Sequence, residues 1–324
     1  MSRMFFEFNV LKKILLHLRR WIVWQLLTLD YTILRLFARF APISIGRCWA
    51  CIRGVIHAAF GYDWYTHATG RYKIRPLVWS SLKRIHSDWP TWRLLLAIVQ
   101  RYIANSINDF EDHALDRLEK QLVVPCSGMS IQQDVHKATI YCIFHYASYI
   151  VGVLWLCKHG RPLHIVASNI FLRTPGIHPL VRGMYTKRLQ FLKYFLNGGD
   201  IHYVEDGMLP IHRAIHRGED VIIAIDLTTK SNKCMCIDFL GLERVPFAAG
   251  VQNMVKGTGA FWRPFTCEWI NGKYLFSLGD SSNDPMEIFK AYNFFAKKID
   301  KCPHLWLASF VLGFHPELES VHSS

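Results

Sequence analysis

The chain has 324 residues, of which 51% are hydrophobic, and its formal net charge is +13. This composition excludes a disordered chain, and the length suffices for one large α/β domain or two small ones. The charge favours an anionic partner, phospholipid or nucleic acid, and 11 Trp, 13 Tyr and 21 Phe favour phospholipid because aromatic rings concentrate at the bilayer interface. No recognisable nucleic-acid reader accompanies the charge. Nine cysteines without a framework spacing indicate a reducing compartment.

The first 41 residues have apolar side chains at steps of three and four, the period of a helix, with Lys and Arg between them. Charged residues interrupt every apolar stretch before the roughly 20 residues that a membrane span needs. We therefore predict an amphipathic helix over 1–41 that lies on an anionic membrane, with Trp21 and Trp24 at the boundary. The alternative is an amphipathic helix packed on its own domain. Residues 42–122 are predicted to be a helical cover.

Residues 123–324 alternate short β-rich runs with helical ones, which predicts an α/β body with a mostly parallel central sheet flanked by helices. The uncharged stretch 138–157 reads as strand, polar turn and buried helix rather than as a membrane span, because ATIYCIF is β-branched and aromatic and HYAS is turn-like. We expect one domain with an N-terminal extension. The expected strands are 138–144, 163–168, 201–204, 221–226, 259–270 and 273–280.

Two titratable residues directly follow expected strands. His145 comes after ATIYCIF, and Asp226 comes after VIIAI. In open α/β sheets, sites form outside the carboxyl ends of the strands. His145 is therefore the first candidate for a functional residue, although a histidine beside an apolar run is often a core residue.

Several segments, in order, resemble the lysophospholipid acyltransferase-like superfamily, specifically its bacterial lipid A lauroyl/myristoyl acyltransferase branch. FHYASYIVGVLWLCKHGRPLHIV is similar to that family's strand, H-F-G-N-W-E turn and helix, and RGEDVIIAIDL to its strand ending in an acidic residue. DFLGLERVPFAAGVQNMVKGTGAFWRP is similar to a V-x-F-F-G-x-x-A stretch followed by a T-G-A-P strand. CPHLWLASF is similar to the terminal P-x-x-W-x-W, with Pro303 and Trp306 retained. The resemblance covers roughly residues 80–310.

The resemblance implies a glycerolipid acyltransferase-like fold and an acyltransferase on the cytoplasmic face of the inner membrane. The donor would be a thioester, acyl-ACP or acyl-CoA, and the acceptor a hydroxyl or amine of a lipid or amphiphile. Neither a metal nor a cofactor is implied. His145 falls on the family's catalytic histidine, a base that works near neutral pH.

The sequence departs from the family pattern beside this histidine. Ile150 stands where the family has the acid that orients the base, Ser148 where Asn is usual and Tyr149 where Trp is usual. Leu242 follows Gly241 where a phosphate-binding Arg is common, and Arg244 is two residues later.

Three hypotheses follow from the missing acid. In the first, His145 is the base and another carboxylate orients it, for which Asp226 at a neighbouring strand end is a candidate. In the second, His145 acts alone. In the third, the protein is a catalytically degenerate lipid-binding or scaffold subunit. In the predicted site, Asp226, Gly241, Arg244 and Ser148 bind substrate, and Asp226 is alternatively structural.

Two further features have functional and ordinary interpretations. Glycines 241, 250, 257 and 259 permit close approach of a phosphate or pantetheine arm, or simply form turns. Arg182, Lys187, Arg188 and Lys193 lie along one expected helix, where they hold lipid phosphate or an acidic carrier protein, or form a solvated basic face.

Overall fold

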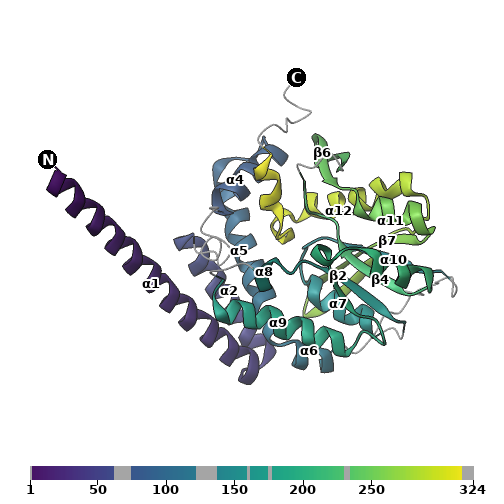
Figure 1. Cartoon of the computed structure of the whole chain (residues 1–324), viewed down its shortest axis with the longest axis horizontal. Helices are drawn as coiled ribbons and strands as arrows, with labels where there is room; N and C mark the ends of the chain where they lie inside the picture. Colours follow the sequence, from purple (N-terminus) through teal and green to yellow (C-terminus); the bar gives the residue numbers. More distant parts are fainter. Residues whose placement is uncertain are drawn as a thin grey trace.

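The computed structural model describes residues 2–61, 74–121, 137–158, 161–173, 177–229 and 234–315. Helices precede the sheet in the chain and then alternate with its strands (Figure 1). The α-helices are α1 (Ser2–Phe40), α2 (Ile43–Phe60), α4 (Ile74–Ile85), α5 (Thr91–His113), α6 (Leu115–Gln121), α7 (Tyr149–Cys157), α8 (Ile170–Arg173), α9 (Pro179–Tyr194), α10 (Leu209–His216), α11 (Gly250–Thr258) and α12 (Phe289–Lys301). The short 3₁₀ segments are η1 (Val204–Asp206), η2 (Pro285–Ile288), η3 (Pro303–Leu305) and η4 (Ser309–Phe314).

The central sheet has six strands in the order β3-β2-β4-β1-β7-β8. All neighbours pair in parallel except β7 and β8, which form an antiparallel edge pair. The predicted mostly parallel α/β sheet with flanking helices is confirmed. Its strands are β1 (Thr139–Ile143), β2 (Leu163–Ala167), β3 (Ile201–Tyr203), β4 (Asp220–Ala224), β7 (Phe261–Ile270) and β8 (Lys273–Leu278).

Both faces of the sheet are covered, and β1 shows this most clearly. Tyr141 and Ile143 belong to the core on one face, with side chains from α1, α2, α5, α6, α7 and α9. Ile140, Cys142 and Phe144 belong to the core on the other face, with side chains from α10, α11, α12 and the C-terminal segment. Burial on both faces explains why β1 reads as a continuous apolar run rather than an alternating one.

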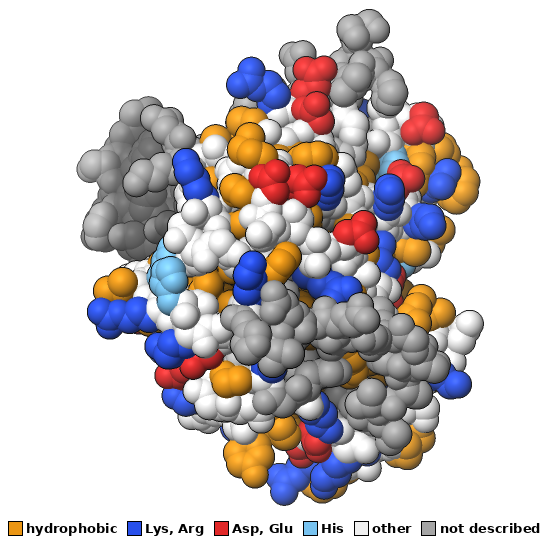
Figure 2. Space-filling view, turned by 90° about the vertical axis from the view of Figure 1, so that its right-hand side faces the viewer, with side chains coloured by type: hydrophobic (Ala, Val, Ile, Leu, Met, Phe, Trp, Pro, Cys, Tyr) orange, Lys and Arg blue, Asp and Glu red, His pale blue; other side chains and the backbone are white. Residues whose placement is uncertain are grey.

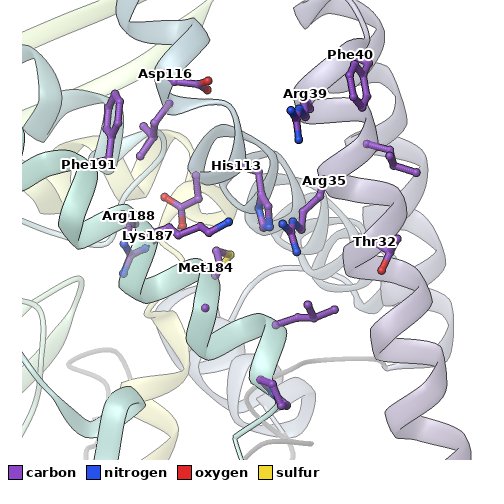
Figure 3. Close-up of a pocket in the computed structure, with 16 residues that line it drawn as sticks. Thr32, Arg35, Arg39, Phe40, His113, Asp116, Met184, Lys187, Arg188 and Phe191 are labelled. Atoms are coloured by element: carbon purple, nitrogen blue, oxygen red, sulfur yellow. Dashed lines mark hydrogen bonds and ion pairs between the residues drawn. The ribbon is translucent and has the colours of Figure 1, made fainter.

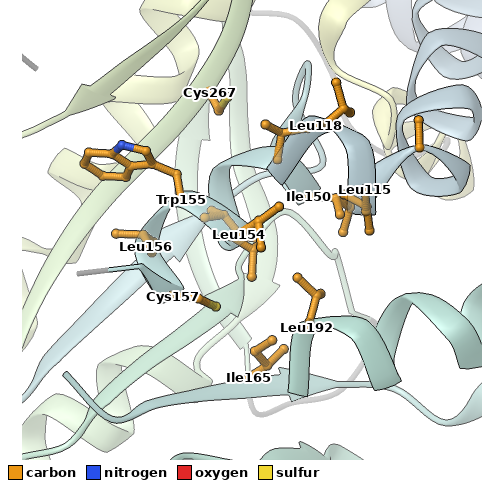
Figure 4. Packing of buried hydrophobic residues seen from close by; sticks show 14 of the residues in the cluster. Leu115, Leu118, Ile150, Leu154, Trp155, Leu156, Cys157, Ile165, Leu192 and Cys267 are labelled. Atoms are coloured by element: carbon orange, nitrogen blue, oxygen red, sulfur yellow. The ribbon is translucent and has the colours of Figure 1, made fainter. Parts of the chain in front are cut away.

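The uncharged stretch 138–157 is strand, turn and buried helix, as predicted. Helix α7 is buried from Ile150 to Cys157, and Figure 4 shows Ile150 and Leu154 packed near Leu115, Leu118 and Leu192. None of the described helices is long and apolar enough to cross a membrane.

The second half of α1 packs on the body, while its first half extends away from it (Figure 1). Leu27, Tyr31, Leu34 and Ala38 are buried at helical spacing. The second half of α1 therefore agrees with the alternative prediction for residues 1–41, an amphipathic helix that packs on its own domain. The side chains of most residues before Trp21 lie outside the described part, so the amphipathic character of the first half stays a prediction.

The helical cover is held to α1 by a buried ion-pair network centred on α2. Arg53 pairs with Asp30 of α1 at 2.7 Å and with Asp109 of α5 at 2.8 Å. Helices α2 and α5 also approach closely, since a Cβ on Gly54 would lie 2.4 Å from the Cα of Ile103. The predicted boundary at 41 falls in the turn between α1 and α2; the boundary at 122 lies outside the described residues.

A two-stranded antiparallel hairpin, β5 (Cys234–Phe239) and β6 (Leu242–Ala248), is additional to the strands expected from the sequence. Its buried side chains, among them Phe239 and Phe247, join the core that contains Phe144. Leu240 and Gly241 form its turn, both with positive φ. The hairpin therefore supports the carboxyl end of β1 from the side of α12.

Candidate active site

His145 and Asp226 form a hydrogen-bonded pair. His145 Nδ1 lies 2.8 Å from Asp226 Oδ1. The pair follows from strand register: β1 and β4 are parallel neighbours with Ile143 opposite Ala224, so the residue two positions beyond each strand meets the other. Both side chains thus lie at the carboxyl edge of the sheet, where sites of this fold class form.

The Asp226 carboxyl is completely enclosed, with a side-chain exposure of 0%, and three donors face it. Besides the His145 ring, Oδ2 accepts the backbone N–H of His145 at 2.8 Å and the indole N–H of Trp306 at 3.0 Å. An ionised carboxylate is the acceptor-only form that suits three donors. Asp226 therefore holds the proton of His145 on Nδ1 and leaves Nε2 as the free acceptor.

His145 keeps 32% of its side chain exposed, so its free edge is accessible. Burial and the charge of Arg188 both lower the pKa of His145. The negative charge of the Asp226 carboxylate and the hydrogen bond to it raise the pKa by more, so the pKa is raised overall. The sequence has no acid at position 150 to orient His145. In the structure, the carboxylate that contacts the His145 ring is that of Asp226. A fully enclosed Asp226 has no surface for substrate, so its geometry suits orientation rather than substrate binding.

The raised pKa has a measurable consequence. By NMR, the ring of His145 is expected to titrate above the ordinary histidine pKa of about 6.5. Because the folded-state pKa is above the unfolded one, the stability contributed by the pair is complete below about pH 6.5 and is lost as pH rises through the folded pKa. In Asp226→Asn the titration should move below that of wild type. Identical titration curves would contradict the assignment.

The turn that carries His145 is clamped by the C-terminal segment. Ala147 N–H donates to the carbonyl of Leu305, and Leu307 N–H donates to the carbonyl of His145. Ala147 has a φ of 49°, which is costly for a residue with a Cβ. The two bonds to the C-terminal segment hold the turn in this conformation. Trp306 lies on the same segment, and its place in the sequence motif gives no sign of its bond to Asp226.

Ile150, which stands in place of the family's acid, and Ser148, a predicted substrate-binding residue, are both buried. Ile150 is 7% exposed and belongs to the core around α7. Ser148 is also buried, and its backbone N–H donates to the carbonyl of Cys267. Its burial leaves little surface for substrate, and its substrate-binding role stays a prediction.

Gly241 and Arg244 lie at the exposed end of the β5–β6 hairpin. Both have positive φ, and the backbone N–H of Arg244 donates to Asp238 Oδ1, so the glycine here forms a turn. Among the described residues, no hydrogen bond or ion pair joins either of them to His145 or Asp226. Substrate binding by Gly241 and Arg244 therefore stays a prediction.

A tyrosine and an ion pair border the histidine on the side of α9. Tyr149 contacts the His145 ring edge-on with centroids 5.0 Å apart. Arg188 interacts electrostatically with both His145 and Tyr149 and pairs with Asp112 of α5 at 2.9 Å. Burial raises the pKa of Asp112 to about 6, with Arg188 opposing the shift. The sequence predicts Arg188 on a basic helix, but it does not reveal that Asp112 of α5 is its ion-pair partner.

A groove of about 600 Å³ lies between α1 and α9, and residues of α5 and α6 also line it (Figure 3). Arg188 and Asp112 line its inner end, whereas His145 does not line it. Arg188 lines the groove and also interacts electrostatically with His145 and Tyr149. The groove and the histidine are therefore neighbouring sites and not parts of one cavity.

No family model matches this sequence, and a search of curated proteins finds no relative. The fold and the site define an α/β protein with a buried-aspartate and histidine pair at the carboxyl edge of its sheet. Chemically, this pair can accept a proton at Nε2 and return it, and no redox or phosphate-loop chemistry is built into it.

Proposed function

We propose that this protein is an acyltransferase that moves a fatty acyl group from a thioester, acyl-ACP or acyl-CoA, to a hydroxyl or amine of a lipid or amphiphilic acceptor. The observation that carries the proposal is the 2.8 Å contact between His145 and the buried Asp226, because it supplies the orienting acid that the sequence lacks at position 150.

The chemistry follows from the pair. His145 Nε2 accepts the proton of the acceptor as its oxygen or nitrogen attacks the thioester carbonyl carbon. The carbon–sulfur bond then breaks, and the departing thiolate takes the proton back from Nε2. Asp226 stabilises the imidazolium that exists between these steps. A thioester is already activated, so no metal is required.

The proposal is tested by incubating a labelled long-chain acyl thioester with wild-type protein and with His145→Ala. Wild type should transfer or hydrolyse the thioester, and the variant should be slower by about 100-fold or more, the usual contribution of a general base. Equal background rates in the two proteins would reject acyl transfer and leave the alternative, a catalytically degenerate lipid-binding subunit.

We also propose that the protein acts at the cytoplasmic face of the inner membrane. On α2 the exposed stripe is free of charged side chains and has Ile45, Ile52, Val55, Ile56 and Phe60 at helical spacing. By contrast, the face of the molecule remote from α1 carries charges of both signs scattered among apolar side chains (Figure 2). An apolar stripe on a cationic protein suits an anionic bilayer.

The same helical region has further exposed apolar side chains on α1 and α5. They include Trp21, Trp24 and Leu29 on α1 and Trp92 on α5. Tryptophan favours the boundary between headgroups and acyl chains. The proposed membrane surface therefore includes α2 and the start of α5 as well as the predicted helix 1–41.

The membrane surface is tested with the double variant Ile52→Glu/Val55→Glu. Both side chains are exposed, so folding should be unaffected, while sedimentation with anionic liposomes should fall by about tenfold or more because a charge on the apolar stripe resists insertion. The control is Leu275→Glu, an equally exposed position on β8. Undiminished binding by the double variant would contradict the assignment of this surface.

A further inference from the structure

The groove between α1 and α9 combines cationic and apolar side chains. Arg35 and Arg39 line it from α1, and Lys187 lines it from α9. Leu36, Phe40 and Met184 line it as apolar walls. Figure 3 shows Arg35 and Lys187 facing each other across the space between the two helices. Both classes of side chain therefore face the same space.

The three outer cations have no ion-pair partner among the residues that the structure describes, whereas the deeper Arg188 is paired with Asp112. At that inner end, Arg188 Nε and Asp112 Oδ1 are buried and have no hydrogen-bond partner within the described part of the chain. Asp116 also lines the groove but forms no ion pair with these cations among the described residues. Three cations that line one groove without ion-pair partners repel one another, and a bound anion relieves this repulsion. Of these two atoms, Arg188 Nε is a donor and therefore has a spare hydrogen bond for such an anion.

The ligand must also suit the walls. An inorganic anion would leave Leu36, Phe40 and Met184 in contact with water, whereas an acyl or other apolar portion would cover them. A phosphate accepts charge-assisted hydrogen bonds from several cations at once. The fitting ligand is thus an amphiphile with a phosphate group next to an apolar portion.

We infer that this groove binds a phosphate-bearing amphiphile, with its phosphate on Arg35, Arg39 and Lys187 and its apolar portion against Leu36 and Met184. The groove is lined at one end by Arg188, which interacts electrostatically with His145 and with Tyr149, the aromatic neighbour of His145, and this position makes the amphiphile the acceptor of the acyl transfer. The binding site stands on the groove alone; only the acceptor role rests on the proposed function.

The experiment measures binding by calorimetry with three probes: dihexanoyl phosphatidic acid, inorganic phosphate and dihexanoylglycerol. The probe that combines both chemistries should bind at least about tenfold more tightly than either partial probe. The triple variant Arg35→Gln/Arg39→Gln/Lys187→Gln should lose about tenfold or more of this affinity. The matched control is Lys256→Gln/Lys273→Gln/Lys301→Gln, which removes three exposed charges elsewhere.

A second variant blocks the space rather than the charge. Gly183 of α9 lines the groove and a Cβ there would meet nothing within 4 Å, so the side chain of Gly183→Trp would start in open space and occupy part of the groove. It should abolish binding of the phosphatidic acid while leaving the melting temperature close to that of wild type. Unchanged binding by Gly183→Trp or by the triple variant would overturn the inference.

The remaining outcomes separate the ligand sources and the two proposals. If inorganic phosphate binds as tightly as phosphatidic acid, the groove is a free-phosphate site and the amphiphile is rejected. If dihexanoylglycerol binds equally tightly, the cations are not used and the inference fails. If His145→Ala binds phosphatidic acid normally but wild type transfers no acyl group, the groove stands and the proposed function fails.

Discussion

Asp226→Asn is expected to slow acyl transfer by about 100-fold to 10,000-fold, nearly as much as loss of His145 itself. Asparagine is neutral, so it cannot stabilise the imidazolium that forms during transfer. Its amide can also present an N–H to the ring and force the proton onto Nε2, the atom that must accept the acceptor's proton. The measurement is the rate of label transfer from an acyl thioester at saturating donor.

This substitution can be separated from simple unfolding because asparagine has nearly the volume of aspartate and can still accept the N–H groups of His145 and Trp306. Asp280→Asn, an exposed position, is the control and should leave the rate unchanged. In Asp226→Asn the pH at which kcat/KM reaches half of its maximum should also fall, since the raised pKa of His145 depends on the carboxylate. Full activity in Asp226→Asn would mean that the pair is structural.

Arg53→Leu is expected to lower the free energy of unfolding by about 3 to 5 kcal/mol, because in a buried setting it removes the cation that pairs with Asp109 and leaves Asp30 with only His57. Asp109 is almost enclosed and Asp30 is largely so. The loss should loosen α1 from α2 and α5, since Arg53 is bonded to residues of both neighbouring helices. Chemical denaturation measures the change, and proteolysis in α1 reports the loosening. Arg213→Leu, at an exposed position on α10, is the control.

The same network predicts an acid dependence. Burial raises the pKa of Asp30, but hydrogen bonds from His57 and Arg53 lower it more, to about 2. A depressed folded-state pKa stabilises the protein above the unfolded pKa near 4, and this contribution is lost as pH falls from about 4 to 2. Arg53→Leu should lose stability less steeply than wild type over that range. A parallel decline in both proteins would show that Arg53 does not hold Asp30 ionised.

The regular elements of the body could be predicted from local pattern. The apolar run 139–143, the β-rich run 220–224 and the helix 179–194 are marked by residues close in sequence; the first lies within the expected strand 138–144, and the second overlaps the expected strand 221–226 but begins one residue earlier and ends two residues earlier. The hairpin of Cys234–Phe239 and Leu242–Ala248 could not, because its exposed side chains blur the alternation and its pairing depends on a turn with positive φ at Leu240 and Gly241. The side of α1 that packs was likewise decided by contacts with distant helices.

For the site, the sequence by itself determined that His145 and Asp226 each follow a buried strand, because strand ends are readable from apolar runs and their polar successors. Only the tertiary structure decided that the two residues meet, since they are 81 positions apart and become neighbours through the parallel register of β1 and β4. It also brought in Trp306, 80 positions beyond Asp226, and the Arg188–Asp112 pair. Local pattern records which residues leave a strand; which strands lie side by side is settled by how the apolar faces of the whole chain pack together.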